Sequence, residues 1–537
     1  SGIHCSNTLF RGGFNVHAKQ CSKKAIVLCA PYKLCYYNFF LEFYYNLGTS
    51  AENKEPVVNL LKEMNNTQLK TVQTSLHDCL YEMFNRGTSK SSNNYKHLLP
   101  MLRIYYELYE LNLVRKYTSY TCFYLKSISI ERNWSDDFRA FLEQREGLLS
   151  YPFCIELYTR VLVLHKENEL DKKDAIRLEF ERANTFFIKP FLELNVEREN
   201  LLLTSMNGLL NRDPLDFKKE LKIQFMGEPG VDQGGVSKEW FSLITKEIFN
   251  VDFGMFSYNK KTRYFWFSSC SEDIVDFELI GIVLGLAIYN DIILDISFPH
   301  ILYKKLLGEP ITFEDYKDFD PECYTSLVQL KEVAKTDDLS ALGMYFETTK
   351  DVFGEIIDVD LIPNGRNVLV TNDNIDQYIT AFTDYFCSSS IGKQFGAFRK
   401  GFLRVVTSPL ILMMRPEELE LVICGTKEFD FVALRESCEY KNYKKDSPVI
   451  QWFWEVVFDL DIEQKKQLLV FVTSNDRVPV GGLGNLRFFI DKYGEVDRYP
   501  TASTCFNALH LPPYPSKDIL KEKLLFAIQN ATGFGLA

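Results

Sequence analysis

The chain has 537 residues, with 46% hydrophobic and 25% charged side chains, a composition typical of a folded globular protein and unlike that of a disordered one. Its formal net charge of −11 argues against a dedicated nucleic-acid binder, which needs clustered Lys and Arg to neutralise phosphates. The 13 cysteines have no regular spacing and no cleavable signal peptide opens the sequence, so reduced thiols in the cytosol or nucleus are expected.

Residues 1–150 have the pattern of a helical region. Periodic apolar segments such as Leu98–Val114 alternate with polar breaks such as Gly87–Asn94. The His and Cys residues near the N-terminus contain no C-x-x-C or H-x₃-H pair, which structural zinc sites usually have. We therefore predict a helical scaffold without a metal site.

From Tyr151 onward helices mix with occasional strands. A strand is expected at Leu221–Phe225, followed by a glycine-rich turn at Gly227–Gly235 and a helix with Ser237 or a neighbour as N-cap. The apolar face of that helix comprises Trp240, Phe241, Ile244 and Ile248. Val236 stands where a phosphate-binding loop needs Lys, so we interpret the turn as one that requires glycines at positive φ, with Glu228 and Asp232 accepting from backbone N–H groups.

The most apolar stretch of the chain is Leu279–Tyr289. It ends at Asn290 and is much shorter than the roughly 20 residues that cross a bilayer. A buried core helix is therefore predicted here, and no membrane span.

The last hundred or so residues are predicted to form a small α/β unit after a short linker at Gly425–Glu428. Its expected elements are a helix at Trp452–Phe458, a strand at Gln467–Val472, a loop at Thr473–Gly482, a strand at Leu486–Ile490, a turn at Cys505 and a helix capped by Ser516. The buried face of the last helix would comprise Ile519, Leu520, Leu524, Leu525 and Ile528.

Cys505 is the candidate nucleophile. Most cysteines are small buried hydrophobic residues, but Thr504 and Asn507 place this one in a polar loop, where a thiol can be exposed. A free thiol with a pKa of about 8.5 supplies a few per cent of thiolate at neutral pH.

Four segments resemble signature segments of the HECT-type ubiquitin ligases, in that family's order and spacing. They are Pro500–Leu509, Thr473–Gly482, Gly227–Gly235 and Leu279–Asn290. The resemblance extends from about Tyr151 to Ala537. Within the family the chain is most similar to the subgroup of the ligase recruited by the papillomavirus oncoprotein, with the HERC ligases next.

The resemblance implies an α+β fold with a bilobed HECT catalytic domain. A large, mainly helical N-lobe (151–424) would be followed by a hinge (425–428) and a small α/β C-lobe (429–537), with the helical residues 1–150 in front. The implied partners are ubiquitin, a ubiquitin-conjugating enzyme and protein substrates, whose choice is assigned to residues 1–150. Cys505 would carry ubiquitin as a thioester, and a substrate lysine would then attack this thioester. The resulting ubiquitination would promote degradation of the substrate or signalling. No cofactor or metal is implied.

The resemblance also implies supporting residues. The neighbours of the cysteine would shape its loop, the loop before it would orient it, and a phenylalanine near the C-terminus would support ligation: Thr504, Phe506, Asn507, Arg477, Pro479 and Phe534. The groove for the conjugating enzyme would contain Ser326, Leu327, Val333, Tyr378 and Phe382. An apolar groove that accepts a partner's aromatic side chain suits this purpose.

The active-site motif departs from the family at one position. Ser503 stands where many members have a histidine, so a proton relay through that histidine cannot apply unchanged. His510 is interpreted as a satisfied surface histidine, and Asp476 or another carboxylate as the candidate that deprotonates the incoming lysine. A second departure is Ser474, where the family often has glycine.

Two other function classes stay open. A cysteine hydrolase acting on ubiquitin conjugates would need a histidine partner for its nucleophile, and the 7 histidines show no such arrangement. A non-catalytic scaffold with an incidental cysteine is the second alternative.

Overall fold

The structure is a computed structural model that describes residues 54–86, 98–128, 134–182, 189–228, 235–352 and 355–530. The chain divides into two compact units, Ser1–Val163 and Leu164–Ala537. The division falls inside helix α8 (Leu157–Arg182).

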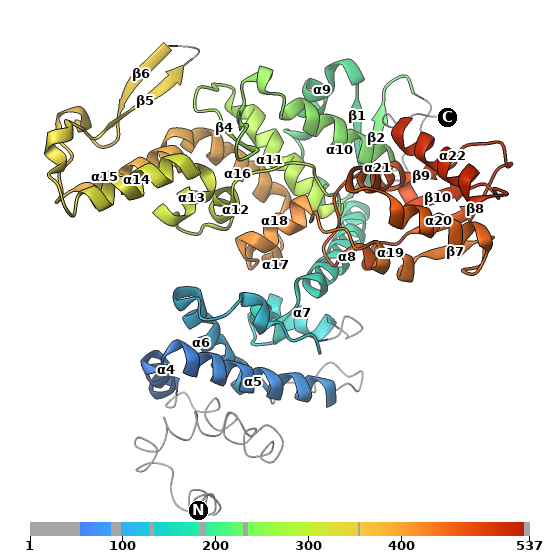
Figure 1. The fold of residues 1–537 in the computed structure, drawn as a ribbon, viewed down its shortest axis with the longest axis horizontal. Coiled ribbons are helices and arrows are strands. Elements are labelled where there is room, and N and C mark those ends of the chain that lie inside the picture. The colour runs from blue at the N-terminus through green and yellow to red at the C-terminus, as the bar shows by residue number, and fades with distance from the viewer. Residues whose placement is uncertain are drawn as a thin grey trace, which may run out of the picture. The chain divides into compact units, whose positions relative to one another are not determined.

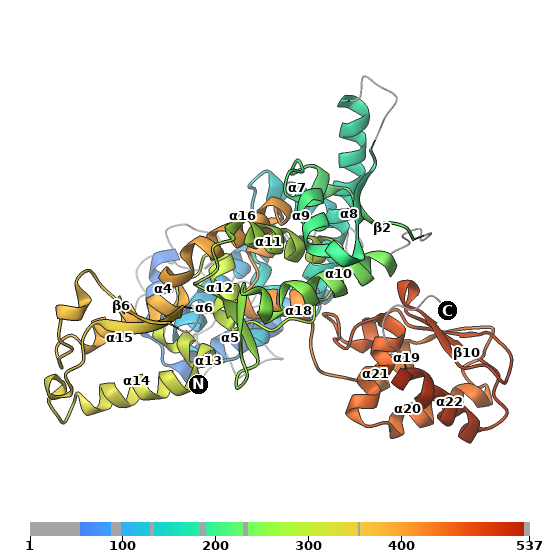
Figure 2. The same ribbon diagram turned by 90° about the horizontal axis from the view of Figure 1, so that it is seen from above.

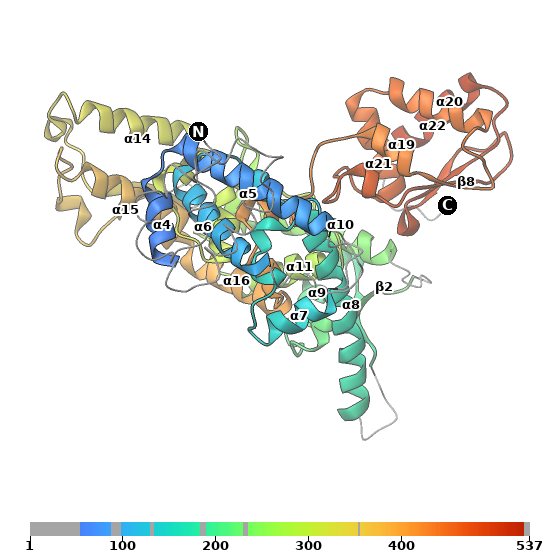
Figure 3. The same ribbon diagram turned by 90° about the horizontal axis from the view of Figure 1, so that it is seen from below.

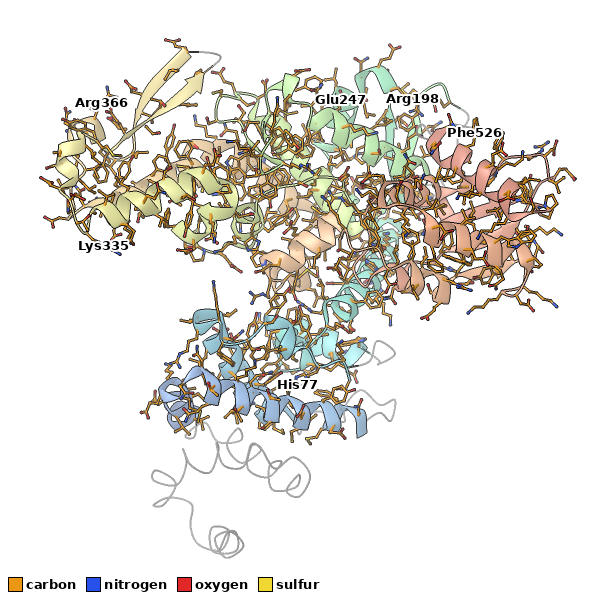
Figure 4. All side chains as sticks on the ribbon, in the orientation of Figure 1. His77, Arg198, Glu247, Lys335, Arg366 and Phe526 are labelled. Carbon is orange, nitrogen blue, oxygen red and sulfur yellow. The ribbon has the colours of Figure 1, made fainter. Side chains whose placement is uncertain are left out.

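The described part of the first unit is helical. It contains α4 (Lys54–Glu63), α5 (Asn66–Arg86), α6 (Leu99–Arg115) and α7 (Ser135–Leu142), so the expected helix at Leu98–Val114 is confirmed as α6. Aromatic rings form its core: the ring of Tyr105 lies 5.1 Å from that of Phe123 and 5.6 Å from that of Phe153. His77, labelled in Figure 4, places Nδ1 2.8 Å from the Tyr105 hydroxyl and so links α5 to α6.

The second unit begins with a parallel strand pair. Strand β1 (Phe191–Val196) pairs with β2 (Glu220–Phe225), in a register that sets Leu194 opposite Ile223. Every second residue of both strands is buried, and the predicted strand at Leu221–Phe225 is confirmed. Helices α9 (Leu201–Leu209) and α10 (Gly235–Ile248) follow their strands, and the predicted apolar face of α10 is buried.

The connection between β2 and α10 is only partly described. Gly227 has a φ of +85°, as the turn interpretation requires. Helix α10 begins at Gly235, so Ser237 lies inside its first turn and not at its cap. The carboxylate of Glu228 binds Arg198, the residue labelled in Figure 4, which also donates to Glu239 at 2.8 Å. Arg198 is therefore one partner of the Glu228 carboxylate, while residues 229–234 of the turn, Asp232 among them, lie outside the described residues.

A helix pair forms the centre of the second unit. The predicted core helix is confirmed as α11 (Ile274–Tyr289), which packs against α16 (Gly392–Val405). A Cβ at Gly281 would lie 1.9 Å from the Phe398 carbonyl oxygen, and one at Gly401 would lie 1.9 Å from that of Glu278. The backbones therefore touch where glycine stands. Among the described helices, none is long and apolar enough to cross a membrane.

A smaller subdomain extends from this centre. Helices α14 (Pro321–Val333) and α15 (Ile375–Cys387) enclose an apolar cluster around Phe346 and Ile379. The hairpin of β5 (Glu347–Val352) and β6 (Glu355–Asp360) lies at the same end of the unit, in yellow in Figure 1. The remaining elements before residue 425 are β3 (Phe256–Asn259), β4 (Tyr264–Phe267), α12 (His300–Leu307), α13 (Tyr316–Phe319), α17 (Pro409–Leu412) and α18 (Pro416–Cys424).

The C-terminal elements form a body with its own core, drawn in orange to red in Figures 2 and 3. The sheet order is β7-β8-β10-β9, with β7, β8 and β10 parallel and β9 antiparallel to β10. The strands are β7 (Glu439–Lys441), β8 (Phe489–Lys492), β9 (Thr501–Ser503) and β10 (Ala508–Leu511). The helices are α19 (Phe431–Ser437), α20 (Pro448–Asp459), α21 (Ile462–Thr473) and α22 (Lys517–Asn530). The mixture of helices and small sheets confirms the α+β class.

The prediction of a strand at Gln467–Val472 is wrong, because this segment lies in α21. Asp461 and Gln464 form a reciprocal capping box, in which the Gln464 N–H donates to Asp461 Oδ1 at 2.8 Å. This cap starts a helix whose buried residues are Leu468, Leu469 and Val472. The helices at Trp452–Phe458 and after Ser516 are confirmed, although Ile519, predicted on the buried face of the second helix, is exposed. The strand predicted at Leu486–Ile490 begins later, at Phe489.

Candidate active site

The backbone of Cys505 lies in a short turn, Thr504–Phe506, that connects β9 to β10. Asn507 ends this turn with a φ of +49°, a left-handed conformation that Asn adopts more readily than most residues. Its Nδ2 donates to the Arg487 carbonyl at 3.3 Å and its own carbonyl accepts from Phe489 N at 3.1 Å. Asn507 therefore connects the turn to β8.

A lysine of α10 also holds this turn. Lys238 Nζ donates to the Thr504 carbonyl at 2.9 Å and to Asn507 Oδ1 at 3.3 Å. The contact brings positive charge to the residue before Cys505. Sequence reasoning missed Lys238, because it lies on a distant helix and no local pattern links it to the turn. Phe506, in contrast, has 58% of its surface exposed next to Cys505.

The loop after α21 contacts the segment that follows α11. Arg477 binds Asp295 Oδ1 through its terminal nitrogen at 2.7 Å, and Asn475 Nδ2 donates to the Ile293 carbonyl at 2.8 Å. Burial, reinforced by the carboxylate of Asp295, raises the pKa of Asp476, which makes this side chain a better proton acceptor than an exposed carboxylate. Pro479 accepts from Gly482 N at 3.0 Å within the same loop.

Ser474 has a φ of +66° at the left-handed end of α21. Glycine adopts this conformation without strain, which explains physically why a glycine suits the position. The serine keeps the same turn at some conformational cost.

Ser503, His510 and Asp491 form a polar row beside the turn. Ser503 Oγ lies 2.8 Å from His510 Nε2, and His510 Nδ1 lies 4.0 Å from Asp491 Oδ2. Within the described part of the chain Nδ1 is buried and has no hydrogen-bond partner. The interpretation of His510 as a satisfied surface histidine is therefore wrong, because strand pairing buries one ring nitrogen and directs the other at Ser503.

The residues proposed for the conjugating-enzyme groove all lie on α14 and α15. Leu327 and Tyr378 belong to the buried cluster of the subdomain, and Phe382 packs against it half-buried. Ser326 is exposed, and Val333 has 40% of its surface exposed. Two further exposed apolar side chains, Leu342 and Tyr345, follow α14 and were missed from the sequence. Phe534 lies outside the described residues.

No group of three or more His, Cys, Asp or Glu side chains among the described residues could hold a metal ion. The cysteines whose side chains the structure describes are free thiols.

Comparison with known proteins identifies one family. Residues 242–537 match the family described as HECT-domain (ubiquitin-transferase). The chain is 38% identical over 412 residues to mouse "Probable E3 ubiquitin-protein ligase HECTD2", covering 73% of this chain and 53% of the relative. It is 34% identical over 470 residues to human "Probable E3 ubiquitin-protein ligase HERC3", covering 83% of this chain and 44% of that relative. It is also 34% identical over 406 residues to "Probable E3 ubiquitin-protein ligase HUL4" of Eremothecium gossypii, covering 72% of this chain and 48% of that relative. The chain thus spans about half the length of these relatives.

Proposed function

Because the chain belongs to the HECT-domain (ubiquitin-transferase) family, we propose that it is an E3 ubiquitin-protein ligase with Cys505 as its thioester-forming nucleophile. The observation that carries the proposal is the turn of Cys505, which lies within the matched residues, at the edge of a small sheet, and is held by Lys238 and Asn507. A reactive thiol on a loop fixed by a rigid scaffold is what acyl transfer requires.

Two transfers make one ligation. In the first, the Cys505 thiolate attacks the carbonyl carbon of the thioester between ubiquitin and the conjugating enzyme, and the enzyme's thiolate leaves. In the second, a lysine nitrogen of the substrate attacks the new thioester, the C–N bond forms, the C–S bond breaks, and the nitrogen loses a proton. The first transfer replaces one cysteine thioester by another of the same kind, so the positioning of the Cys505 thiol matters more than its activation. Neither step involves oxidation or reduction.

The proposed lobes are residues 151–424 and 429–537, joined by a hinge at 425–428. In support, the C-terminal body has a core of its own, from Phe431 to Ile528. Gly425 has a φ of +63°, and Thr426 pairs with Val478 through hydrogen bonds of 2.8 and 2.9 Å. The polar contacts of Lys238, Asn475 and Arg477 connect the two lobes. Water can replace such contacts, so the C-lobe can turn from the conjugating enzyme to the acceptor lysine.

The conjugating enzyme is proposed to bind the subdomain of α14 and α15. Ser326 and Val333 offer exposed surface there, and Leu342 and Tyr345 extend the apolar part of it. Leu327, Tyr378 and Phe382 lie in or against the buried cluster, so we assign them the support of this surface. Exposed apolar side chains in one region are typical of a protein-binding site.

Several finer assignments belong to the same proposal. The similarity to HERC3 supports a place near the HERC ligases, and the nearer place beside the papillomavirus-associated ligase rests on the sequence motifs. Residues 1–150 are proposed to bind substrates or partners, and Phe534 to support ligation. The free thiols support a reducing compartment, cytosol or nucleus.

A charging assay tests the function. The chain is incubated with ubiquitin, activating enzyme, conjugating enzyme and ATP, and run on a non-reducing gel. We expect a thiol-sensitive ubiquitin adduct on the intact chain, and none on Cys505→Ala. Cys122→Ala is the matched control, because it removes an exposed free thiol far along the sequence from the turn, and should charge normally.

Three outcomes would contradict the proposal. An intact chain without an adduct favours a scaffold, and an adduct that persists in Cys505→Ala assigns the thioester to another cysteine. Net cleavage of added ubiquitin conjugates favours the cysteine hydrolase.

A further inference from the structure

The polar row beside the active-site turn follows from strand register. In the antiparallel pair β9–β10, Ser503 stands opposite Ala508, so His510 is its diagonal neighbour on the same face. In the parallel pair β8–β10, His510 stands opposite Asp491. The core side of β10 is occupied by Leu509 and Leu511, which are fully buried, so His510 points to the other side of the sheet.

The distances assign the protons within this row. Asn442 Nδ2 donates to Asp491 Oδ1 at 2.9 Å and so orients the carboxylate, whose other oxygen lies 4.0 Å from His510 Nδ1. The negative charge favours a proton on Nδ1, because that nitrogen has no other partner among the described residues. Nε2 then presents its lone pair and accepts the Ser503 O–H at 2.8 Å.

Ser503 links this lone pair to the backbone of the active-site turn. It lies two residues before Cys505 at the end of β9, so their Cα atoms are separated by no more than about 7 Å. The imidazole that Ser503 contacts comes from the neighbouring strand β10.

We propose that Ser503 and His510 accept the proton that a substrate lysine releases when it attacks the thioester on Cys505. The inference rests on the proposed ubiquitin transfer. The lysine nitrogen forms its bond to the carbonyl carbon of ubiquitin, the C–S bond breaks, and the electron pair stays on the Cys505 sulfur. Ser503 takes the proton from the nitrogen while passing its own proton to Nε2. His510 becomes an imidazolium, stabilised by the carboxylate of Asp491, and no oxidant or co-reactant is needed.

A purely structural role is the competing explanation, since the Ser503–His510 bond also joins β9 to β10. The two differ in pH dependence. The titratable and polar groups around His510 are Asp491 on β8, Tyr493 just after it, whose ring lies 5.5 Å away, and Ser503 and Thr501 on β9. A proton acceptor must be neutral to work, so its contribution disappears at low pH. A structural contact would change the rate by a similar factor at every pH.

The experiment separates charging from discharge. The full chain is charged with ubiquitin on Cys505, charging is quenched, and single-turnover discharge onto free lysine is followed from pH 6 to 9. We expect His510→Gln and Ser503→Ala to charge at the normal rate but to discharge about 100-fold more slowly near neutral pH, at the lower end of what general base catalysis contributes. The difference in discharge rate between these variants and the intact chain should shrink toward low pH, because a protonated imidazole accepts no further proton.

Matched variants make the result specific. Thr501→Ala removes a hydroxyl from the same strand, opposite His510, and should discharge normally. The double variant Ser503→His with His510→Gln places an imidazole at position 503 itself and should recover much of the discharge rate. Asp491→Asn, which keeps the shape of the side chain, should slow discharge less than His510→Gln does.

Normal discharge by charged His510→Gln overturns the inference, and so does an equal slowing at all pH values or a failure of the double variant to recover. If the intact chain does not charge at all, the proposed function fails first. Circular dichroism checks that each variant is folded. If His510→Gln is unfolded, the pH dependence of discharge is measured on Asp491→Asn instead.

Discussion

The α11–α16 pair and the contact between the C-terminal body and the rest of the second unit are held by opposite means. In the first, glycines let two helix backbones touch, and Gly281 leaves no space even for a methyl group. In the second, charged and polar side chains span the contact, as Lys238 does to Thr504 and Arg477 to Asp295. Backbone contact cannot slide, whereas hydrogen bonds can be exchanged for water.

The ion pair between the C-terminal body and the rest of the unit is weak. Asp295 has 68% of its side chain exposed although Arg477 has only 9%, so water screens the ion pair from one side and its contribution is on the order of 1 kcal/mol. A domain contact with that composition can open and close, which the proposed transfer between two partners requires. The α11–α16 centre, in contrast, serves as the fixed frame.

The largest effect is expected for Gly281→Ala. Its Cβ would lie 1.9 Å from the Phe398 carbonyl oxygen and 2.7 Å from the Phe402 nitrogen, so the helices must separate. We expect the free energy of unfolding to fall by about 3 kcal/mol, as for other overpacked cores, in urea denaturation. Gly396→Ala on α16 is the control, because nothing lies within 4 Å of its Cβ, and it should stabilise the helix by about 0.5 kcal/mol. Equal effects would contradict the fixed frame.

Gly425→Ala is expected to cost less, about 2 kcal/mol at most. Its φ is +63° and its Cβ would lie 2.6 Å from the Val478 carbonyl oxygen. The strain can be relieved if the hydrogen bonds between Thr426 and Val478 break. No such local rearrangement can relieve the clash at Gly281, which lies between two helix backbones. Amide hydrogen exchange should therefore accelerate at Thr426 and Val478, while the amides of α11 keep their protection. Faster exchange in α11 would show that the linker and the frame are one cooperative unit.

Glu420→Gln should change stability in a pH-dependent way. Burial, reinforced by the carboxylates of Asp318 and Glu417 and opposed by Arg477, raises the pKa of Glu420 to about 7. The folded state then holds a proton that the unfolded state releases near pH 4.5, so stability falls as pH rises from about 4.5 to 7. Glutamine removes this loss, and we expect the variant to be more stable than the intact chain by about 1 to 2 kcal/mol at pH 8.

Near pH 4.5 the two proteins should differ little, which serves as the internal control. Thermal unfolding at several pH values makes the measurement. A constant difference at all pH values would contradict the raised pKa.

Lys238→Met should have the smallest effect on stability, below about 1 kcal/mol, because it removes only polar contacts from a partly exposed site. Its consequence is local: amide exchange in the Thr504–Phe506 turn should rise. Lys246→Met is the control, since this exposed lysine lies in the last turn of the same helix. Unchanged exchange in the turn of Lys238→Met would indicate that α10 does not hold it.

Local sequence patterns predicted helices and strands well where packing and propensity agree. The apolar run in α11 and the alternation in β2 were both recognised, because each pattern has only one way to bury its apolar side. The segment Gln467–Val472 was predicted as a strand because its β-branched and aromatic residues favour one, but it lies in α21. The capping box at Asp461, three residues from Gln464, was the signal that could have corrected the prediction.

The site divides in the same manner. The sequence by itself determined the turn of Cys505 and the family motifs around it, since these depend on neighbours along the chain. Only the tertiary structure decided that His510 meets Ser503 and that Lys238 reaches Thr504. The first depends on the register of β9 against β10, the second on how a distant helix approaches the turn. Such contacts depend on how whole elements pack against one another, and no local sequence pattern encodes them.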